Sequence, residues 1–318
     1  MFELIVKWSE RQGGISDVED HPLCSNPDSA WCQYFKDNEV LLQINKDVRR
    51  LCPEISFFQQ ATEFPFKDPV TQRVLSLSRR ISNELLNAEN LTQNRSGMNN
   101  LVKTSRKYAE EEYKELWDGQ EAHWQVVERI LFVYCKLNPG VQYVQGMNEI
   151  LGPIYYVFAS DPNVLWREFA EADSYYCFQY LMSEIKDNFI RTMDSSKFGI
   201  EFQMRCLFGL LKDTDLTLYT HIAEKQEIRP EYFAFRWLSL LLSQEFLLPD
   251  VIRIWDSLFA DENRFQFLLY VYDCSFKGFC VQTLISVFRH VRDALMNNDF
   301  SSNIRLLQVM PCLLLFGS

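Results

Sequence analysis

The sequence predicts an all-α protein, and three observations carry this prediction. Apolar residues recur mainly at intervals of three and four, which is the spacing of one face of a helix. Glycine is sparse, with 11 in a chain of 318 residues, and the two-residue alternation typical of strands is weak throughout. With 47% of its residues apolar, the chain can fill a core between such helices.

The first two helices are expected at 31–51 and 121–137. In the first, apolar residues follow one helical stripe that should end before Pro53, because proline lacks an amide hydrogen and disfavours a helical residue before it. The second is closed by the helix breakers Asn138, Pro139 and Gly140. Its apolar face is expected to carry Trp124, Val127, Leu131 and Tyr134.

The rest of the chain is expected to be helical apart from one insertion. Between Gln59 and Gln120 the character changes, and residues 83–100 hold six asparagines and few large apolar side chains. We expect a surface insertion there, in part disordered, that joins two helical blocks. Further helices are expected over residues 145–158, 164–190, 201–211, 232–246 and 250–259, followed by apolar chain over 265–296.

Composition excludes several classes of function. A formal net charge of −11 disfavours non-specific binding to nucleic acid or to anionic lipid, because both need a cationic surface. The nine cysteines are scattered and the four histidines stand singly, which supports neither a disulfide framework nor a zinc site and suits a reducing compartment. No Gly-Lys-Ser/Thr follows the regularly spaced Gly140, Gly146 and Gly152, so the chain should not hydrolyse nucleotide by itself.

The first polar motif runs from Ile44 to Arg50, at the end of the first expected helix. Asp47 and Arg50 are i,i+3 neighbours and can form an ion pair, while Ile44 turns inward and anchors the turn. The result would be an arginine held by a carboxylate at the rim of a helix end. A purely structural interpretation also exists, because cations near a helix C-terminus complement its dipole.

The second polar motif, Tyr143-Val144-Gln145-Gly146-Met147-Asn148, precedes an apolar helix. A glutamine beside a glycine can project from backbone that a partner approaches closely. Alternatively, these residues are the polar start of a helix whose core residue is Met147.

Taken together, Ile-x-x-Asp-x-x-Arg and, about ninety residues later, Tyr-x-Gln-Gly-Met-Asn resemble the TBC domain of Rab GTPase-activating proteins. The resemblance extends over about residues 21–270. It includes Phe235-Arg236-Trp237, Glu245-Phe246 followed by Pro249-Asp250, and the segment Val251-Ile252-Arg253-Ile254-Trp255-Asp256-Ser257-Leu258-Phe259. The resemblance implies a two-lobed all-α domain.

The resemblance also implies roles for the two motifs. Arg50 would be an arginine finger and Gln145 a glutamine finger, both inserted into the active site of a GTP-loaded Rab protein to accelerate hydrolysis. Asp47 would position Arg50, and Tyr143 would fix the loop that carries Gln145. Structural support would come from Ile44, Gly146 and Asn148.

By the same resemblance the chain activates a GTPase and is not itself an enzyme. GTP and Mg²⁺ would be bound by the Rab partner, with no cofactor on this chain. A cytoplasmic protein is expected, recruited to endomembranes only through the lipidated Rab and binding no nucleic acid. Two rival hypotheses are a Rab-binding or scaffolding protein without catalytic effect and an unrelated helical adaptor.

The expected domain plan has three parts. Residues 1–20 lie outside the resemblance, residues 21–310 form the TBC domain, and residues 311–318 form an apolar tail. Within the domain, the insertion covers about 59–120 and an atypical segment covers 272–290, where a glycine and charged residues interrupt apolar sequence. These departures suggest a truncated or alternatively spliced form with intact catalytic motifs.

Overall fold

A computed structural model describes residues 29–78, 116, 119–189, 199–261 and 288–308. The described residues form helices, turns and loops, and their β-structure consists of two isolated bridges, Ala61 with Ala122 and Lys67 with Val74. The all-α prediction is therefore confirmed. The chain divides into two compact units, residues 1–148 with 158–175 and residues 149–157 with 176–318.

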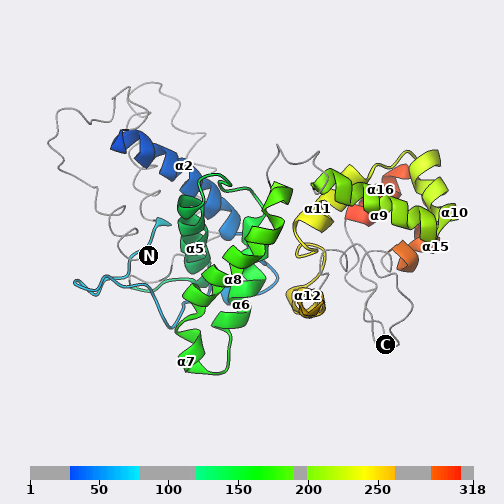
Figure 1. The fold of residues 1–318 in the computed structure, drawn as a ribbon. Helices are drawn as coiled ribbons and strands as arrows, with labels where there is room; N and C mark the ends of the chain where they lie inside the picture. Colours follow the sequence, from blue (N-terminus) through cyan, green and yellow to red (C-terminus); the bar gives the residue numbers. More distant parts are fainter. Residues whose placement is uncertain (1–28, 79–115, 117–118, 190–198, 262–287, 309–318) are drawn as a thin grey trace, which may run out of the picture. The chain divides into compact units, whose positions relative to one another are not determined.

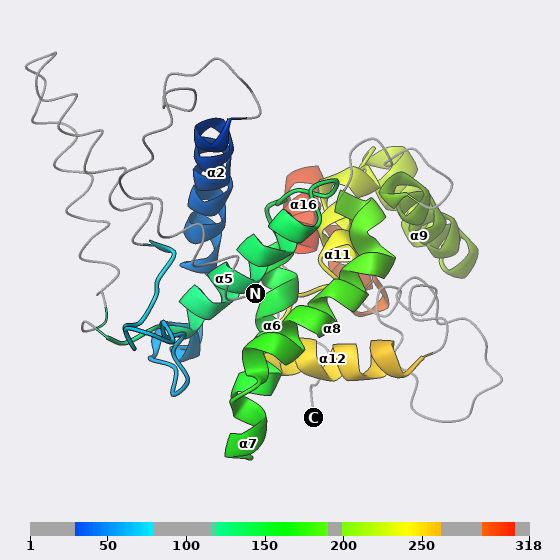
Figure 2. The same ribbon diagram turned by 60° about the vertical axis from the view of Figure 1, so that its left-hand side comes forward.

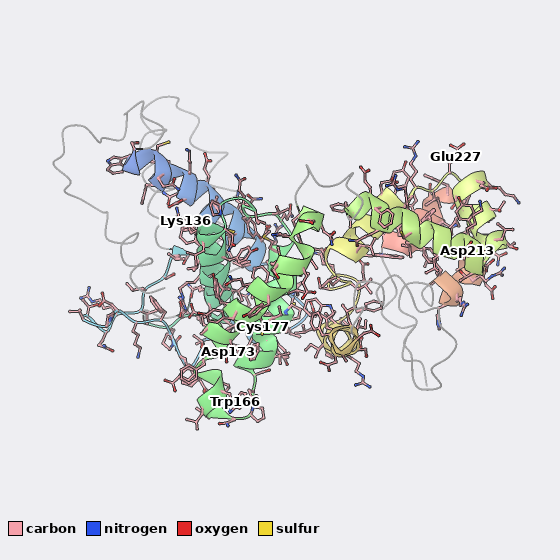
Figure 3. All side chains as sticks on the ribbon, in the orientation of Figure 1. Lys136, Trp166, Asp173, Cys177, Asp213 and Glu227 are labelled. Carbon is pink, nitrogen blue, oxygen red and sulfur yellow. The ribbon has the colours of Figure 1, made fainter. Side chains whose placement is uncertain are left out.

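The first unit is built on two long helices that pack against each other, α2 (Ala30–Val48) and α5 (His123–Leu137) (Figures 1 and 2). Ser29 caps α2 by accepting a hydrogen bond from the backbone N–H of Cys32 at 3.0 Å, which satisfies one of the open N-terminal amides. Lys136 of α5, labelled in Figure 3, binds Asp37 of α2 with 2.6 Å between Nζ and Oδ1. The apolar stripes are buried over Leu41, Ile44 and Val48 of α2 and over Val127, Leu131 and Tyr134 of α5, as their spacing predicts. At the start of the stripes, Phe35 is 42% exposed and Trp31 and Trp124 are half-buried, so the prediction fails there.

A buried ionic cluster ties further segments of the first unit to α5. Arg129 is 1% exposed and binds the carboxylates of Glu121, which precedes α5, and of Glu171. Glu121 also accepts a hydrogen bond from the backbone N–H of Phe66 at 2.8 Å. Because a buried charge is stable only when paired, this cluster fixes the loop around Phe66 and the segment that carries Glu171 against α5.

Among the described residues, the smaller elements of the first unit are a 3-10 turn η1 (Phe57–Gln59), α7 (Val164–Arg167) and the start of α8 (Ala170–Ile185). α8 and the helix α6 (Met147–Ala159) contribute residues to both units. The prediction of a single helix over 164–190 is wrong, since the chain forms α7, α8 and a 3-10 turn η2 (Lys186–Phe189) instead. Asn163 caps α7, and the chain then tightens into a 3-10 bond from Phe169 N–H to the carbonyl of Trp166.

The second unit has a core of aromatic rings. Trp237 lies 4.7 Å from Phe233 and 5.8 Å from Phe288 between ring centroids, and all three side chains are buried. Besides its parts of α6 and α8 and the turn η2, the described residues of this unit form α9 (Ile200–Thr214), α10 (Leu216–Tyr219), the π-helical turn η4 (Thr220–Lys225), η5 (Pro230–Tyr232), α11 (Ala234–Ser239), α12 (Leu248–Ala260), α15 (Arg292–Asn297) and α16 (Phe300–Gln308).

The prediction of a helix over 232–246 is also wrong, because α11 ends at Ser239 and the chain then turns. Leu241 and Leu242 have φ values of 49° and 64°, a left-handed conformation that leucine rarely takes. Their side chains are each 1% exposed, and the indole N–H of Trp255 donates to the carbonyl of Leu241 at 2.8 Å. Tertiary packing therefore overrides the local helical pattern.

Several sequence predictions lie outside the described residues. These are the amino-terminal segment 1–20, the asparagine-rich part of the insertion at 83–100, residues 272–287 of the atypical segment and the tail 311–318. The described part of the insertion, residues 59–78, consists of loop and turn.

Candidate functional site

The first polar motif forms a tight turn at the end of α2, which we call the finger turn, residues 48–51. Arg50 N–H donates to the carbonyl of Asp47 at 3.1 Å, and Leu51 N–H donates to that of Val48 at 3.2 Å. The motif is anchored in the core by Ile44, Val48 and Leu51, which are 0%, 0% and 1% exposed. The helix ends three residues earlier than the apolar stripe, so Arg50 lies just beyond it.

Arg50 projects from this turn with 64% of its side chain exposed. Its Nη2 lies 3.3 Å from Oδ1 of Asp47, the i,i+3 pair that the spacing predicts, and its Nε donates to the carbonyl of Lys46 at 3.1 Å. A guanidinium has five N–H groups, so three have no partner among the described residues. The side chain is therefore oriented by its own helix and still able to bind an anion.

The second polar motif lies in the connection between α5 and α6, which we call the glutamine loop, residues 138–146. Asn138 ends α5 by donating its backbone N–H and its side-chain amide to the carbonyl of Tyr134, each at 2.9 Å. Gly146 has a φ of 105°, which other residues adopt only at a cost. α6 begins at Met147, two residues later than expected, which leaves Gln145 exposed in a turn ahead of the helix.

One hydrogen bond joins the two motifs across 96 residues of sequence. The hydroxyl of Tyr143, a residue 7% exposed, donates to Oδ2 of Asp47 at 2.9 Å, and it lies 3.4 Å from Oδ1 of the buried Asn148. Asp47 is thus shared, with one oxygen on Arg50 and the other on Tyr143. The exposed Arg50 and Gln145 therefore stand on segments tied together by a buried bond.

Beneath the finger turn lies a second set of polar residues that the sequence reasoning missed. Arg49 donates from Nε to Oδ1 of Asn45 at 3.0 Å, and Asn45 donates from Nδ2 to Oε1 of Glu128 at 2.6 Å. Glu128 lies in α5 and is 0% exposed. A signal did exist, because Glu128 interrupts the apolar stripe formed by Trp124 and Leu131.

The electrostatics of Glu128 differ from those of an ordinary surface carboxylate. Burial raises its pKa to about 7, against the opposing effects of the hydrogen bond from Asn45 and the positive charges of Arg49 and Arg129. Within the described ranges, no group of histidine, cysteine, aspartate and glutamate side chains could hold a metal ion. Nor do those ranges include a helix long and apolar enough to cross a membrane.

Comparison with known proteins decides the family. Residues 105–284, more than half of the chain, match the model of the Rab-GTPase-TBC domain. This chain belongs to the TBC domain family. The TBC match confirms the resemblance drawn from the two motifs, and it contains the glutamine loop, whereas the finger turn precedes the matched range.

Relatives in the TBC family extend over nearly the whole chain. TBC1 domain family member 13 is 56% identical in Mus musculus and 55% in Homo sapiens, each over 92% of this chain and 71% of the relative. A TBC domain-containing protein of Schizosaccharomyces pombe is 34% identical over 91% of this chain and 55% of its own length. The crystal structure of the Ypt/Rab-GAP domain of Gyp1p, 22% identical, covers 87% of this chain and 68% of its own with a TM-score of 0.56, which supports the TBC fold.

Proposed function

We propose that this chain is a GTPase-activating protein for a Rab-family GTPase, with Arg50 and Gln145 supplied in trans to the GTP-bound partner. Membership of the TBC family supports the class of partner. The observation that supports the assignment of residues is the hydrogen bond from Tyr143 to Asp47, because it ties the segment that carries Gln145 to the carboxylate that orients Arg50.

Arg50 suits the charge that develops during hydrolysis. Phosphoryl transfer spreads negative charge over the γ-phosphate oxygens, and a planar guanidinium with three open N–H groups can contact two of them at once. An arginine finger contributes roughly 10³–10⁵ in rate, or about 4–7 kcal/mol of transition-state stabilisation. Asp47 holds the guanidinium by one edge in advance, which lowers the entropy lost when the site assembles.

Gln145 suits the task of orienting the attacking water. A side-chain amide donates and accepts hydrogen bonds, so it can hold a water toward phosphorus while contacting the nucleotide. Its position in an exposed turn before α6 lets it enter another protein's active site. In this proposal GTP and Mg²⁺ belong to the partner, and the chain acts from the cytoplasm, reaching membranes only through the Rab.

Phosphate release from a panel of purified, GTP-loaded Rab proteins tests the proposal. We expect the parent chain to accelerate release from at least one of them. Arg50→Ala and Gln145→Ala should each lose nearly all of the acceleration while still binding the same Rab, because the fingers act on the transition state. Arg205→Ala, at an exposed site on α9, is the matched control and should behave as the parent.

Two results would contradict this assignment. Full acceleration by Arg50→Ala would show that the finger is another residue. Binding of GTP-loaded Rab proteins without any acceleration by the parent would instead make the chain a Rab-binding or scaffolding protein.

A further inference from the structure

Arg49, the neighbour of the proposed arginine finger, is fixed from several directions. Its guanidinium carbon lies 4.8 Å from the ring centroid of Trp124, on α5, and its Nε is bonded to Asn45. Its backbone carbonyl accepts a hydrogen bond from the side-chain amide of Gln59, in η1, at 3.2 Å. Because Arg49 and Arg50 are consecutive residues, this anchoring determines how the backbone presents Arg50.

The bond from Arg49 to Asn45 depends on which way the Asn45 amide is turned. An ionised carboxylate can only accept hydrogen bonds, so Glu128 requires Asn45 to present its NH₂ group. The carbonyl oxygen of Asn45 then points the other way and accepts from Arg49. The charge state of Glu128 is in this way transmitted through one amide to the finger turn.

Among the neighbours of Glu128, Asn45 and Arg49 are the ones that link it to the finger turn. Facing it from α5 and its start are Arg129 and Glu121, and Arg129 is already paired with Glu121 and with Glu171 of α8. From α2 and the finger turn it meets Asn45 and Arg49. Its second oxygen, Oε2, is buried and has no hydrogen-bond partner among the described residues. A buried carboxylate with an unbonded oxygen lowers the stability of the fold, so a contribution to stability does not explain its presence.

We propose that Glu128 is a positioning residue for the arginine finger, which it holds in place through Asn45 and Arg49 only while it is a carboxylate. The catalytic part of this proposal rests on the function proposed above. A protonated Glu128 can donate from its O–H as well as accept, so it no longer fixes the orientation of the Asn45 amide, and the amide can turn its carbonyl toward Glu128. Arg49 then loses the Asn45 oxygen as an acceptor, and the finger turn loses one of its attachments.

The burial of Glu128 sets the pH at which this change occurs. With a pKa of about 7, the carboxylate gains its proton as the pH falls through neutrality. The parent should therefore show a kcat for stimulated GTP hydrolysis that is lower at pH 6 than at pH 8. The effect should fall on kcat and leave KM nearly unchanged, because Glu128 is buried away from the partner.

The kinetic test compares the parent with Glu128→Gln and Asn45→Ala between pH 6 and pH 8, each rate divided by the Rab's unstimulated rate at the same pH. Both variants should lose the pH dependence and lower kcat at pH 8 by about 10-fold, the scale of a slightly misplaced catalytic group. Glu201→Gln, the same change at an exposed site on α9, should follow the parent. A Glu128→Gln protein with the parent's kcat and pH profile would overturn the proposal.

A second measurement needs no Rab protein and separates this proposal from the function on which it rests. In protein labelled with ¹⁵N-arginine, the Nε–H signal of Arg49 should shift as the pH crosses about 7 in the parent and stay constant in Glu128→Gln. If the parent stimulates no Rab, the proposed function fails, and this titration alone decides whether Glu128 holds the finger turn. An Arg49 signal that is the same in both proteins at every pH would overturn the positioning role.

Discussion

At the scale of single residues, Asp47 holds the two halves of the candidate site together. It is 8% exposed and divides its two oxygens between Arg50 and Tyr143, so one carboxylate orients both polar motifs. Hydrogen bonds to a charged acceptor are the stronger kind, and the bond from Tyr143 is buried. Loss of that single donor should therefore affect both stability and activity.

Replacing Tyr143 with phenylalanine tests this reasoning. The variant keeps the ring but leaves a buried oxygen of Asp47 without its donor, which should cost about 1–3 kcal/mol in the free energy of unfolding. Chemical denaturation measures that loss, and Rab-stimulated phosphate release should fall in kcat. Tyr180→Phe, at a site 73% exposed on α8, should change neither quantity. A Tyr143→Phe protein as stable and active as the parent would show that the bond contributes nothing.

At the scale of elements, the glutamine loop is shaped by backbone geometry. Gly146 has a positive φ of 105° directly before α6, so the loop reverses at a residue without a Cβ. The preceding turn is held by Val141 N–H, which donates to the carbonyl of Asn138 at 3.0 Å. Gln145 is thus held between a fixed turn and the first residue of a helix.

Gly146→Ala should strain this loop. An alanine forced to this φ costs about 1–3 kcal/mol, and relief of the strain would move Gln145, so stability and stimulated hydrolysis should both fall. The matched control is Gly209→Ala in α9, where an added Cβ meets no atom within 4 Å. That control should raise the free energy of unfolding by up to about 1 kcal/mol, because alanine favours a helix. Urea titrations of the two variants should show a lower free energy of unfolding for Gly146→Ala and a higher one for Gly209→Ala than in the parent.

The sequence predicts features that depend on residues close together in the chain, and it misses those that depend on residues far apart. The spacing of Asp47 and Arg50 lies within one helical turn, so their pair could be predicted, as could α2, α5, α9 and α12 from their apolar stripes. The partnership of Asn45 and Glu128 spans 83 residues, and no local pattern encodes it. The turn after α11 was missed for the same reason, because a hydrogen bond from Trp255 supports it.

At the scale of the whole molecule, ionisation of one buried group links stability to pH. Glu128 has a pKa of about 7 when folded and about 4.5 when exposed, so the folded chain binds more protons between these values. The stabilisation that protonation of Glu128 provides is complete below pH 4.5 and is lost as the pH rises through 7. His123 acts in the opposite direction, because burial lowers its pKa to about 4 and folding then favours the neutral ring.

Comparing the parent with Glu128→Gln isolates this effect, since His123 is common to both and cancels in the difference. Relative to the parent, the variant should become more stable by on the order of 3 kcal/mol as the pH rises from 5 to 8, because it has no carboxylate to ionise in the core. Denaturant titrations at several pH values measure the change, and a difference that stays constant would contradict the raised pKa. The same substitution is expected to slow stimulated hydrolysis at pH 8, so stability and activity should move in opposite directions. That opposition separates a carboxylate that positions the finger from one that only supports the fold, because loss of a supporting group would lower both.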